Sequence, residues 1–174
     1  RHEFLPENLQ KSAYDDRALP IDCNQTISQP FVVAAMTEAL ELSRGQRVLE
    51  VGTGSGYQAA VLAEMGVEVF TVEFHADLSR QAEAVLRRIG YRNVHFRVGD
   101  GGQGWPEEAP FQGMILTCRA PRLPDPLKDQ LADGGRCVAP IGSEYEQMLR
   151  VVRRDGESWT SRDLFPVRFV PMLG

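Results

Sequence analysis

The sequence predicts an α/β fold in which a mostly parallel sheet is extended at its C-terminal edge by antiparallel strands. Strand-like runs alternate with helix-like segments between residues 47 and 140, which is typical of right-handed βαβ units around a parallel sheet. A loop with three glycines follows the first of these strands. The last strand-like runs have no helix between them, and this arrangement favours antiparallel pairing.

The first predicted elements belong to the N-terminal part of the chain. Residues 1–26 are polar and rich in turn-forming residues, so we expect this N-terminal segment to lie over the rest of the domain. An apolar-periodic stretch then continues through Leu42. Ser28 is expected to cap this helix, with Pro30 in its first turn, since both residue types are favoured at a helix start. Gly45 follows as a stop signal.

The remaining elements are read from hydrophobic periodicity. The expected strands of the parallel part are Arg47–Val51, Glu68–Val72, Val94–Val98, Gly113–Thr117 and Arg136–Pro140. The expected helices are Gly56–Met65, Ala76–Ile89 and a short one near Pro124–Leu131. The antiparallel edge is expected to contain Gln147–Arg153, Trp159–Leu164 and Val167–Val170.

Length and composition limit the organisation and the partners. A chain of 174 residues, 43% of them hydrophobic, is expected to form one domain over residues 1–174 with a core of its own. The net charge of −5 argues against nucleic acid and against an anionic membrane as partners. Cys23, Cys118 and Cys137 show no C-x-x-C spacing. We therefore expect neither disulfides nor a metal site, and a reducing compartment, the cytoplasm.

The most informative stretch is the loop Gly52-Thr53-Gly54-Ser55-Gly56, which joins an apolar strand to a helix. In a βα unit this loop lies at the carboxyl edge of the sheet, where open α/β folds bind ligands. The spacing G-x-G-x-G differs from the dinucleotide fingerprint G-x-G-x-x-G. Glu50 near the strand end suits a cationic ligand better than a pyrophosphate.

Two further acidic residues follow the next two strands. Glu73 is positioned to accept hydrogen bonds from ribose hydroxyls, and Asp100 to accept one from an adenine amino group. Taken singly, the glycine loop is a tight turn, Glu73 a solvated strand end and Asp100-Gly101 a common turn dipeptide. Taken together and in this order, they indicate a nucleoside with a cationic tail, which fits S-adenosylmethionine better than NAD.

Motifs along nearly the whole chain resemble one family, the protein-L-isoaspartate (D-aspartate) O-methyltransferases. The glycine loop is generic to S-adenosylmethionine-dependent methyltransferases, whereas two segments are more particular to this family: Gln25-Thr26-Ile27-Ser28 and Val167-Arg168-Phe169-Val170-Pro171. Other matching segments include Leu19-Pro20-Ile21, Val48–Ala60, Gly99-Asp100-Gly101 and Gly104-Trp105-Pro106. The family usually starts with a further helical part, which we expect ahead of Arg1.

The resemblance implies a Rossmann-like methyltransferase fold and a repair activity. A methyl group would pass from S-adenosylmethionine, leaving S-adenosylhomocysteine, to the α-carboxylate of L-isoaspartyl residues in damaged proteins and peptides. A carboxylate is already ionised at neutral pH, so no general base is required, and His2, His75 and His95 are given no catalytic role. The expected partners are isoaspartyl proteins, and the chain is expected to be a monomer.

The resemblance also assigns site residues. Ser28 matches the residue that the family treats as its active-site serine, and Thr26 and Ser28 would contact the substrate carboxylate. Val170 matches a region whose backbone pairs with the substrate peptide; the alternative is an ordinary edge strand. Residues expected to bind the cofactor are Gln25, Thr26, Ile27, Ser28, Glu50, Gly52, Thr53, Gly54, Ser55, Gly56, Glu73, Asp100 and Gly101.

Two departures from the family pattern keep other functions open. Asp22-Cys23-Asn24 replaces a segment that usually contains glycine, and Cys118-Arg119 stands in a run of small residues. Arg119 either points outward or contacts an acidic substrate. The alternatives are a relative that methylates an aspartate side chain of a dedicated peptide to form an aspartimide, a tRNA methyltransferase, and a non-catalytic cofactor-binding module.

Overall fold

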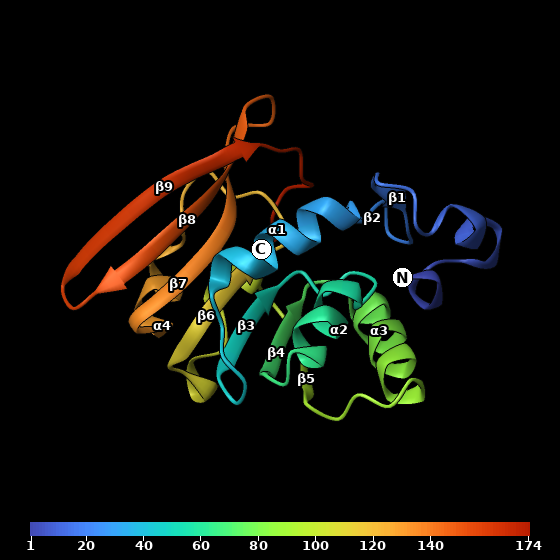
Figure 1. Cartoon of the computed structure of the whole chain (residues 1–174), viewed down its shortest axis with the longest axis horizontal. Helices are drawn as coiled ribbons and strands as arrows, with labels where there is room; N and C mark the ends of the chain where they lie inside the picture. The colour runs from blue at the N-terminus through green and yellow to red at the C-terminus, as the bar shows by residue number, and fades with distance from the viewer.

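The computed structural model describes residues 1–174, and it contains the predicted mostly parallel sheet (Figure 1). Seven strands form this sheet in the order β5-β4-β3-β6-β7-β8-β9. The strands from β5 to β7 run parallel, and β8 and β9 are antiparallel additions at one edge. The parallel strands are β3 (Arg47–Val51), β4 (Glu68–Glu73), β5 (Val94–Val98), β6 (Phe111–Leu116) and β7 (Leu131–Gly142).

The helices cover both faces of the sheet, because each parallel crossover returns over one face. α1 (Pro30–Leu40), α2 (Tyr57–Glu64) and α3 (Ala76–Arg88) pack on one side. The short α4 (Asp125–Gln130) packs on the other side, against the 3₁₀ turn Gly101–Gln103. None of these helices is long and apolar enough to span a membrane.

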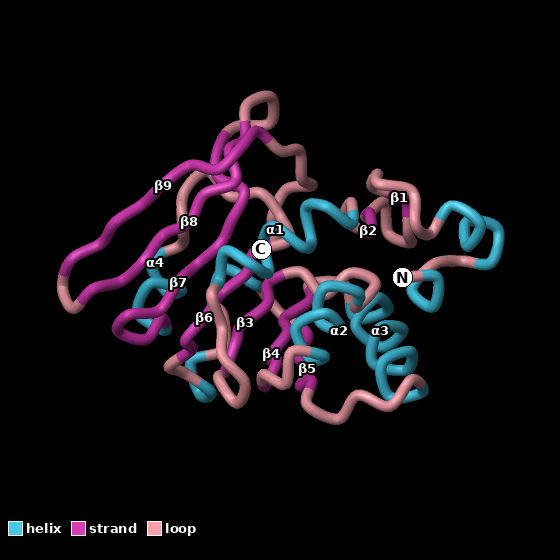
Figure 2. Tube along the Cα trace, in the orientation of Figure 1, coloured by secondary structure: helices cyan, strands magenta, loops and turns pink.

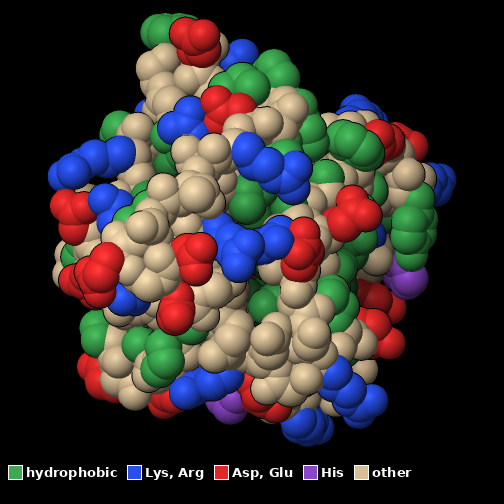
Figure 3. Space-filling model, turned by 60° about the vertical axis from the view of Figure 1, so that its left-hand side comes forward, with side chains coloured by type: hydrophobic (Ala, Val, Ile, Leu, Met, Phe, Trp, Pro, Cys, Tyr) green, Lys and Arg blue, Asp and Glu red, His purple; other side chains and the backbone are tan.

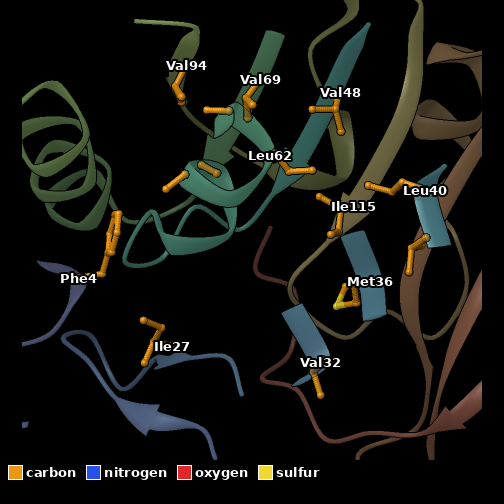
Figure 4. Close-up of a cluster of buried hydrophobic side chains, with 14 of the residues drawn as sticks. Phe4, Ile27, Val32, Met36, Leu40, Val48, Leu62, Val69, Val94 and Ile115 are labelled. Atoms are coloured by element: carbon orange, nitrogen blue, oxygen red, sulfur yellow. The ribbon is translucent and has the colours of Figure 1, made fainter. Parts of the chain in front are cut away.

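The larger part of the core lies between the sheet and α1 to α3. Figure 4 shows Val48 and Val69 of the sheet pointing toward Leu62 of α2, with Met36 of α1 in the same cluster. Phe4 from the N-terminal segment is buried in this cluster too. The N-terminal segment is therefore part of the folded core rather than a loose extension.

The start of α1 differs from the prediction. The N-cap residue is Gln29, and neither it nor Ser28 caps the helix with its side chain. Instead the Asp16 carboxylate accepts hydrogen bonds from the Phe31 backbone amide (2.9 Å) and from the Gln29 side chain (3.0 Å). These bonds hold the pKa of Asp16 below its usual value. The predicted Ser28 cap was wrong because a residue from the N-terminal segment supplies the carboxylate, and such a long-range cap has no local signature.

The C-terminal edge consists of two strands rather than three. β8 (Gln147–Asp155) and β9 (Ser158–Pro166) form a long hairpin. The prediction of a third strand at Val167–Val170 was wrong: this part is a loop that runs from β9 toward the centre of the molecule (Figure 2). Gln147 holds it there, since its side-chain oxygen accepts a hydrogen bond from the Phe169 amide (2.8 Å).

The outer strand β9 is exposed along most of its length. Acidic and basic side chains alternate on the side of the molecule that carries β8 and β9 (Figure 3). Arg150 of β8 and Asp163 of β9 form one of these pairs, with Nε and Oδ1 2.6 Å apart. Charges on a free edge oppose pairing with strands of other molecules.

Candidate cofactor and substrate site

A cavity lies beyond the carboxyl ends of the parallel strands, between the loops that follow β3, β4 and β6. The strand order changes direction here, since β3 has β4 on one side and β6 on the other. Open α/β sheets bind their ligands at such a switch point. The space between these loops amounts to about 740 Å³ when its open mouth is included.

The glycine loop forms one wall of the cavity. Gly52 has a φ of +95°, and a Cβ atom there would lie 2.4 Å from the Thr117 hydroxyl oxygen. That hydroxyl donates to the Val51 carbonyl (3.0 Å). Gly101, which also lines the cavity, would place a Cβ atom 2.3 Å from Val51. Only glycine lets the backbone pack this closely against these neighbours, so a side chain at either position would displace the cavity wall.

The Glu73 carboxylate is fixed at the end of β4. One oxygen accepts a hydrogen bond from the Gly54 amide (2.9 Å), and the other accepts one from the His75 amide (2.9 Å). The residue is buried and lines the cavity. Each carboxylate oxygen can accept more than one hydrogen bond, so Glu73 can also bind hydroxyl groups of a ligand.

Glu50 has a different environment from the one predicted. It is fully buried and does not line the cavity. Its Oε2 accepts a hydrogen bond from the Thr71 hydroxyl (2.6 Å), whose oxygen lies 2.6 Å from that of Thr53 in the cavity wall. Its Oε1 is buried without a hydrogen-bond partner. Burial raises the pKa of Glu50 to about 8, with the charge of Glu73 adding to the effect.

Two other predicted cofactor residues also lie outside the cavity wall. Gly56 begins α2 with a φ of +87°, and its missing side chain allows α3 to pack against it. The Asp100 carboxylate accepts a hydrogen bond from the Gly102 amide (2.7 Å), which caps the following turn. The remaining predicted residues do line it: Gln25, Thr26, Ile27, Ser28, Gly52, Thr53, Gly54, Ser55, Glu73, Gly101 and Val170.

Several residues that line the cavity were not assigned a binding role from the sequence. Thr117 and Cys118 follow β6 and reach the cavity beside the glycine loop. Cys118 is buried, and burial raises the pKa of its thiol to about 12, so it is an unreactive wall residue. The position of Thr117 and Cys118 at the end of a parallel strand was the sequence feature that could have predicted their place in the cavity wall. Tyr57, which lies in the matching segment Val48–Ala60, also lines the cavity. So do Phe74, His75, Met172 and Leu173, to which no motif in the sequence pointed.

A second hollow adjoins the first. Its walls come from the start of α1 and from the loop after β9, and it shares Thr26 and Ser28 with the first cavity. Phe31 and Phe165 form part of its apolar wall, with ring centroids 5.5 Å apart. Arg168 lies on its exposed rim. Arg119 lines neither hollow. Its backbone pairs with the Val170 carbonyl and the Met172 amide.

The parallel sheet, the switch-point cavity with its glycine loop and buried carboxylate, and the antiparallel strands at one edge define the Rossmann-like fold of S-adenosylmethionine-dependent methyltransferases. Residues 1–174 match the family described as "Protein-L-isoaspartate(D-aspartate) O-methyltransferase (PCMT)". The chain belongs to this family.

Individual relatives agree with this assignment. The chain is 52% identical over 173 residues to a protein-L-isoaspartate O-methyltransferase of Gloeobacter violaceus, covering 99% of this chain and 84% of that protein. It is 54% identical to the enzyme of the same name from Maricaulis maris, with 99% and 81% covered.

Solved structures show the same similarity. A protein-L-isoaspartate O-methyltransferase superposes with a TM-score of 0.92 at 30% identity; the match covers all of this chain and 58% of that one. A putative Plasmodium falciparum enzyme of the family, solved with S-adenosyl-L-homocysteine, gives a TM-score of 0.79 at 25% identity, with 99% and 85% covered.

Proposed function

We propose that the protein is a repair enzyme that transfers a methyl group from S-adenosylmethionine to the α-carboxylate of L-isoaspartyl residues in damaged proteins and peptides. Family membership over the whole chain supports the reaction. The observation that carries the proposal is that the two hollows meet at Thr26 and Ser28. A ligand in one and a polypeptide in the other would face each other across these two residues.

S-adenosylmethionine, when bound, supplies a sulfonium methyl group. Glu73 would hold its ribose hydroxyls, because the carboxylate is already oriented by two backbone amides. The glycine loop would form the wall against which the ligand lies, and the close packing of Gly52 against Thr117 would hold that wall in place. Glu50 would not contact the cofactor. It would orient the Thr71 hydroxyl and, through it, the Thr53 hydroxyl in the wall of the first cavity.

The substrate carboxylate requires orientation rather than proton removal, because it is ionised at neutral pH. Holding two reactants in line is itself a large source of rate acceleration. Ser28 suits this role, because its side chain makes no capping bond to α1 and the residue lines both hollows. Thr26 would supply a second hydroxyl.

Val170 would contribute its backbone to peptide binding. Its carbonyl already accepts a hydrogen bond from the Arg119 amide (2.7 Å), so we assign pairing with the peptide to its amide group. In the sequence, Arg119 raised the possibility of a different, acidic substrate. Because Arg119 lines neither hollow, that possibility loses support. We also infer a cytoplasmic location, since all three cysteines are free.

Radiolabelled methyl transfer tests the proposal with two peptides that differ only in an isoaspartyl or an aspartyl residue. We expect incorporation into the isoaspartyl peptide alone. Preference for the aspartyl peptide would indicate aspartimide formation, and cofactor binding without transfer would indicate a non-catalytic module.

The role of Ser28 has a separate test. Ser28→Ala is expected to lower turnover at least tenfold, which corresponds to about 1.4 kcal/mol, while affinity for S-adenosylhomocysteine changes much less. Equal losses of both, or no loss of either, would contradict the assigned role.

A further inference from the structure

Arg1 has an unusual environment for an arginine. Only 8% of the residue is exposed, and none of the ion pairs in the protein includes it. Its guanidinium donates instead to four backbone carbonyls, those of Ala13, Asp15, Arg17 and Ser28. A buried charge is costly unless it is hydrogen-bonded. Nη1 and Nη2 are paired in this way, whereas Nε is buried without a hydrogen-bond partner, so the group depends on these carbonyls being in place.

The four carbonyls come from two separate parts of the chain. Three belong to the turns between residues 13 and 17 of the N-terminal segment, at distances of up to 3.3 Å. The fourth belongs to Ser28, whose oxygen lies 2.9 Å from Nη2. The guanidinium thus ties the turns around Asp16, which caps α1, to the peptide unit that precedes α1.

A lysine side chain at position 1 cannot form the same set of hydrogen bonds. A guanidinium directs five N–H groups in fixed planar directions, whereas an ammonium group offers three donors around a single nitrogen. The four acceptors are distributed over Nη1 and Nη2. The guanidinium also lies 6.0 Å from the centre of the Tyr57 ring, which lines the first cavity.

We propose that Arg1 is a positioning residue, which sets the orientation of the Ser28 peptide unit and thereby places the Ser28 hydroxyl between the two hollows. This inference rests on the proposed function of Ser28. The opposite wall of the cavity, with the glycine loop and Glu73, has its own hydrogen bonds and does not involve Arg1. Loss of Arg1 should therefore affect methyl transfer more than binding of the cofactor.

The test compares Arg1→Ala and Arg1→Lys with a control that destabilises the same segment. Leu5→Ala removes a buried side chain of the N-terminal segment, and Leu5 supplies none of the four carbonyls that Arg1 binds. For each variant, kcat and KM for an isoaspartyl peptide, the thermal midpoint, and the Kd for S-adenosylhomocysteine by calorimetry are measured. Turnover of Arg1→Ala is also measured with millimolar guanidinium chloride and with equal sodium chloride.

We expect kcat to fall at least tenfold in both Arg1 variants, with less than a threefold change in Kd. Leu5→Ala should keep kcat within threefold of the wild type at a comparable loss of thermal midpoint. Guanidinium, but not sodium chloride, should restore part of the turnover of Arg1→Ala. A Leu5→Ala variant as impaired as Arg1→Ala, restoration by Arg1→Lys, or no specific effect of guanidinium would overturn the proposal.

The two hypotheses fail in different ways. If Ser28→Ala keeps normal turnover, the role assigned to Ser28 fails. If Ser28→Ala is impaired but Arg1→Ala is not, the role of Ser28 stands and only the positioning role of Arg1 is refuted.

Discussion

The buried carboxyl group of Glu50 should make the stability of the protein fall as pH rises. Its pKa is raised from 4.5 to about 8 in the folded state, mainly by burial. Between these values the unfolded chain has released the proton and the folded chain still holds it. The folded state then binds more protons, so the free energy of unfolding decreases with increasing pH. The contribution is fully present below the unfolded pKa and is lost once pH passes the folded one.

The size of this effect follows from the two pKa values. Each pH unit between them is worth roughly 1.4 kcal/mol, so the full contribution is about 5 kcal/mol. Between about pH 5.5 and about pH 8.5 the loss is about 3 kcal/mol. Glu50→Gln removes the titration, and its amide oxygen can still accept the hydrogen bond from Thr71.

Urea unfolding of both proteins without cofactor, followed by circular dichroism, measures this difference. At the lower pH the two free energies of unfolding should be similar, and at the higher pH the variant should be the more stable by several kcal/mol. Comparing the two proteins at each pH cancels the titration of all other groups. A difference that stays constant within about 0.5 kcal/mol over this range would refute the argument from burial.

Three other substitutions test features of the loops. Cys23→Gly should raise the free energy of unfolding by about 0.5–1 kcal/mol, because Cys23 has a φ of 57°; a lower thermal midpoint than that of Cys23→Ala would contradict this. Gly52→Ala should weaken S-adenosylhomocysteine binding at least tenfold in calorimetry, whereas Gly90→Ala, with positive φ but open space, should bind normally. Asp16→Ala should lower the thermal midpoint at neutral pH. Because hydrogen bonds lower the pKa of Asp16, this difference should disappear as pH falls through that pKa; a constant difference would argue against the cap.

The parallel part of the fold was predictable because its signals are local. β3 has the predicted range Arg47–Val51, and β5 has the predicted range Val94–Val98. β3 is a mostly apolar, buried run, and β5 alternates apolar with polar residues. Both patterns are read directly from the local sequence. The predicted fold class is confirmed by the sheet order and by the family structures.

Features that depend on distant residues were not predictable. The cap of α1 comes from Asp16, and the loop at Phe169 is held by Gln147. In both cases the partner is far away in sequence and is an ordinary polar residue. Glu50 was predicted to bind the cofactor from its place near the end of an apolar strand, and only the packing around it shows that Thr71 and Thr53 lie between it and the cavity.

The hydrogen bonds between Arg119 and the tail have a consequence for the order in which the site is assembled. The Arg119 amide donates to Val170, and its carbonyl accepts from the Met172 amide (2.9 Å). Met172 and Leu173 complete the wall of the first cavity. The glycine loop leaves the ribosome long before these residues do. A nascent chain can therefore contain the loop and its neighbouring strands, yet have a closed cofactor cavity only once the tail has been synthesised and has joined the chain at Arg119.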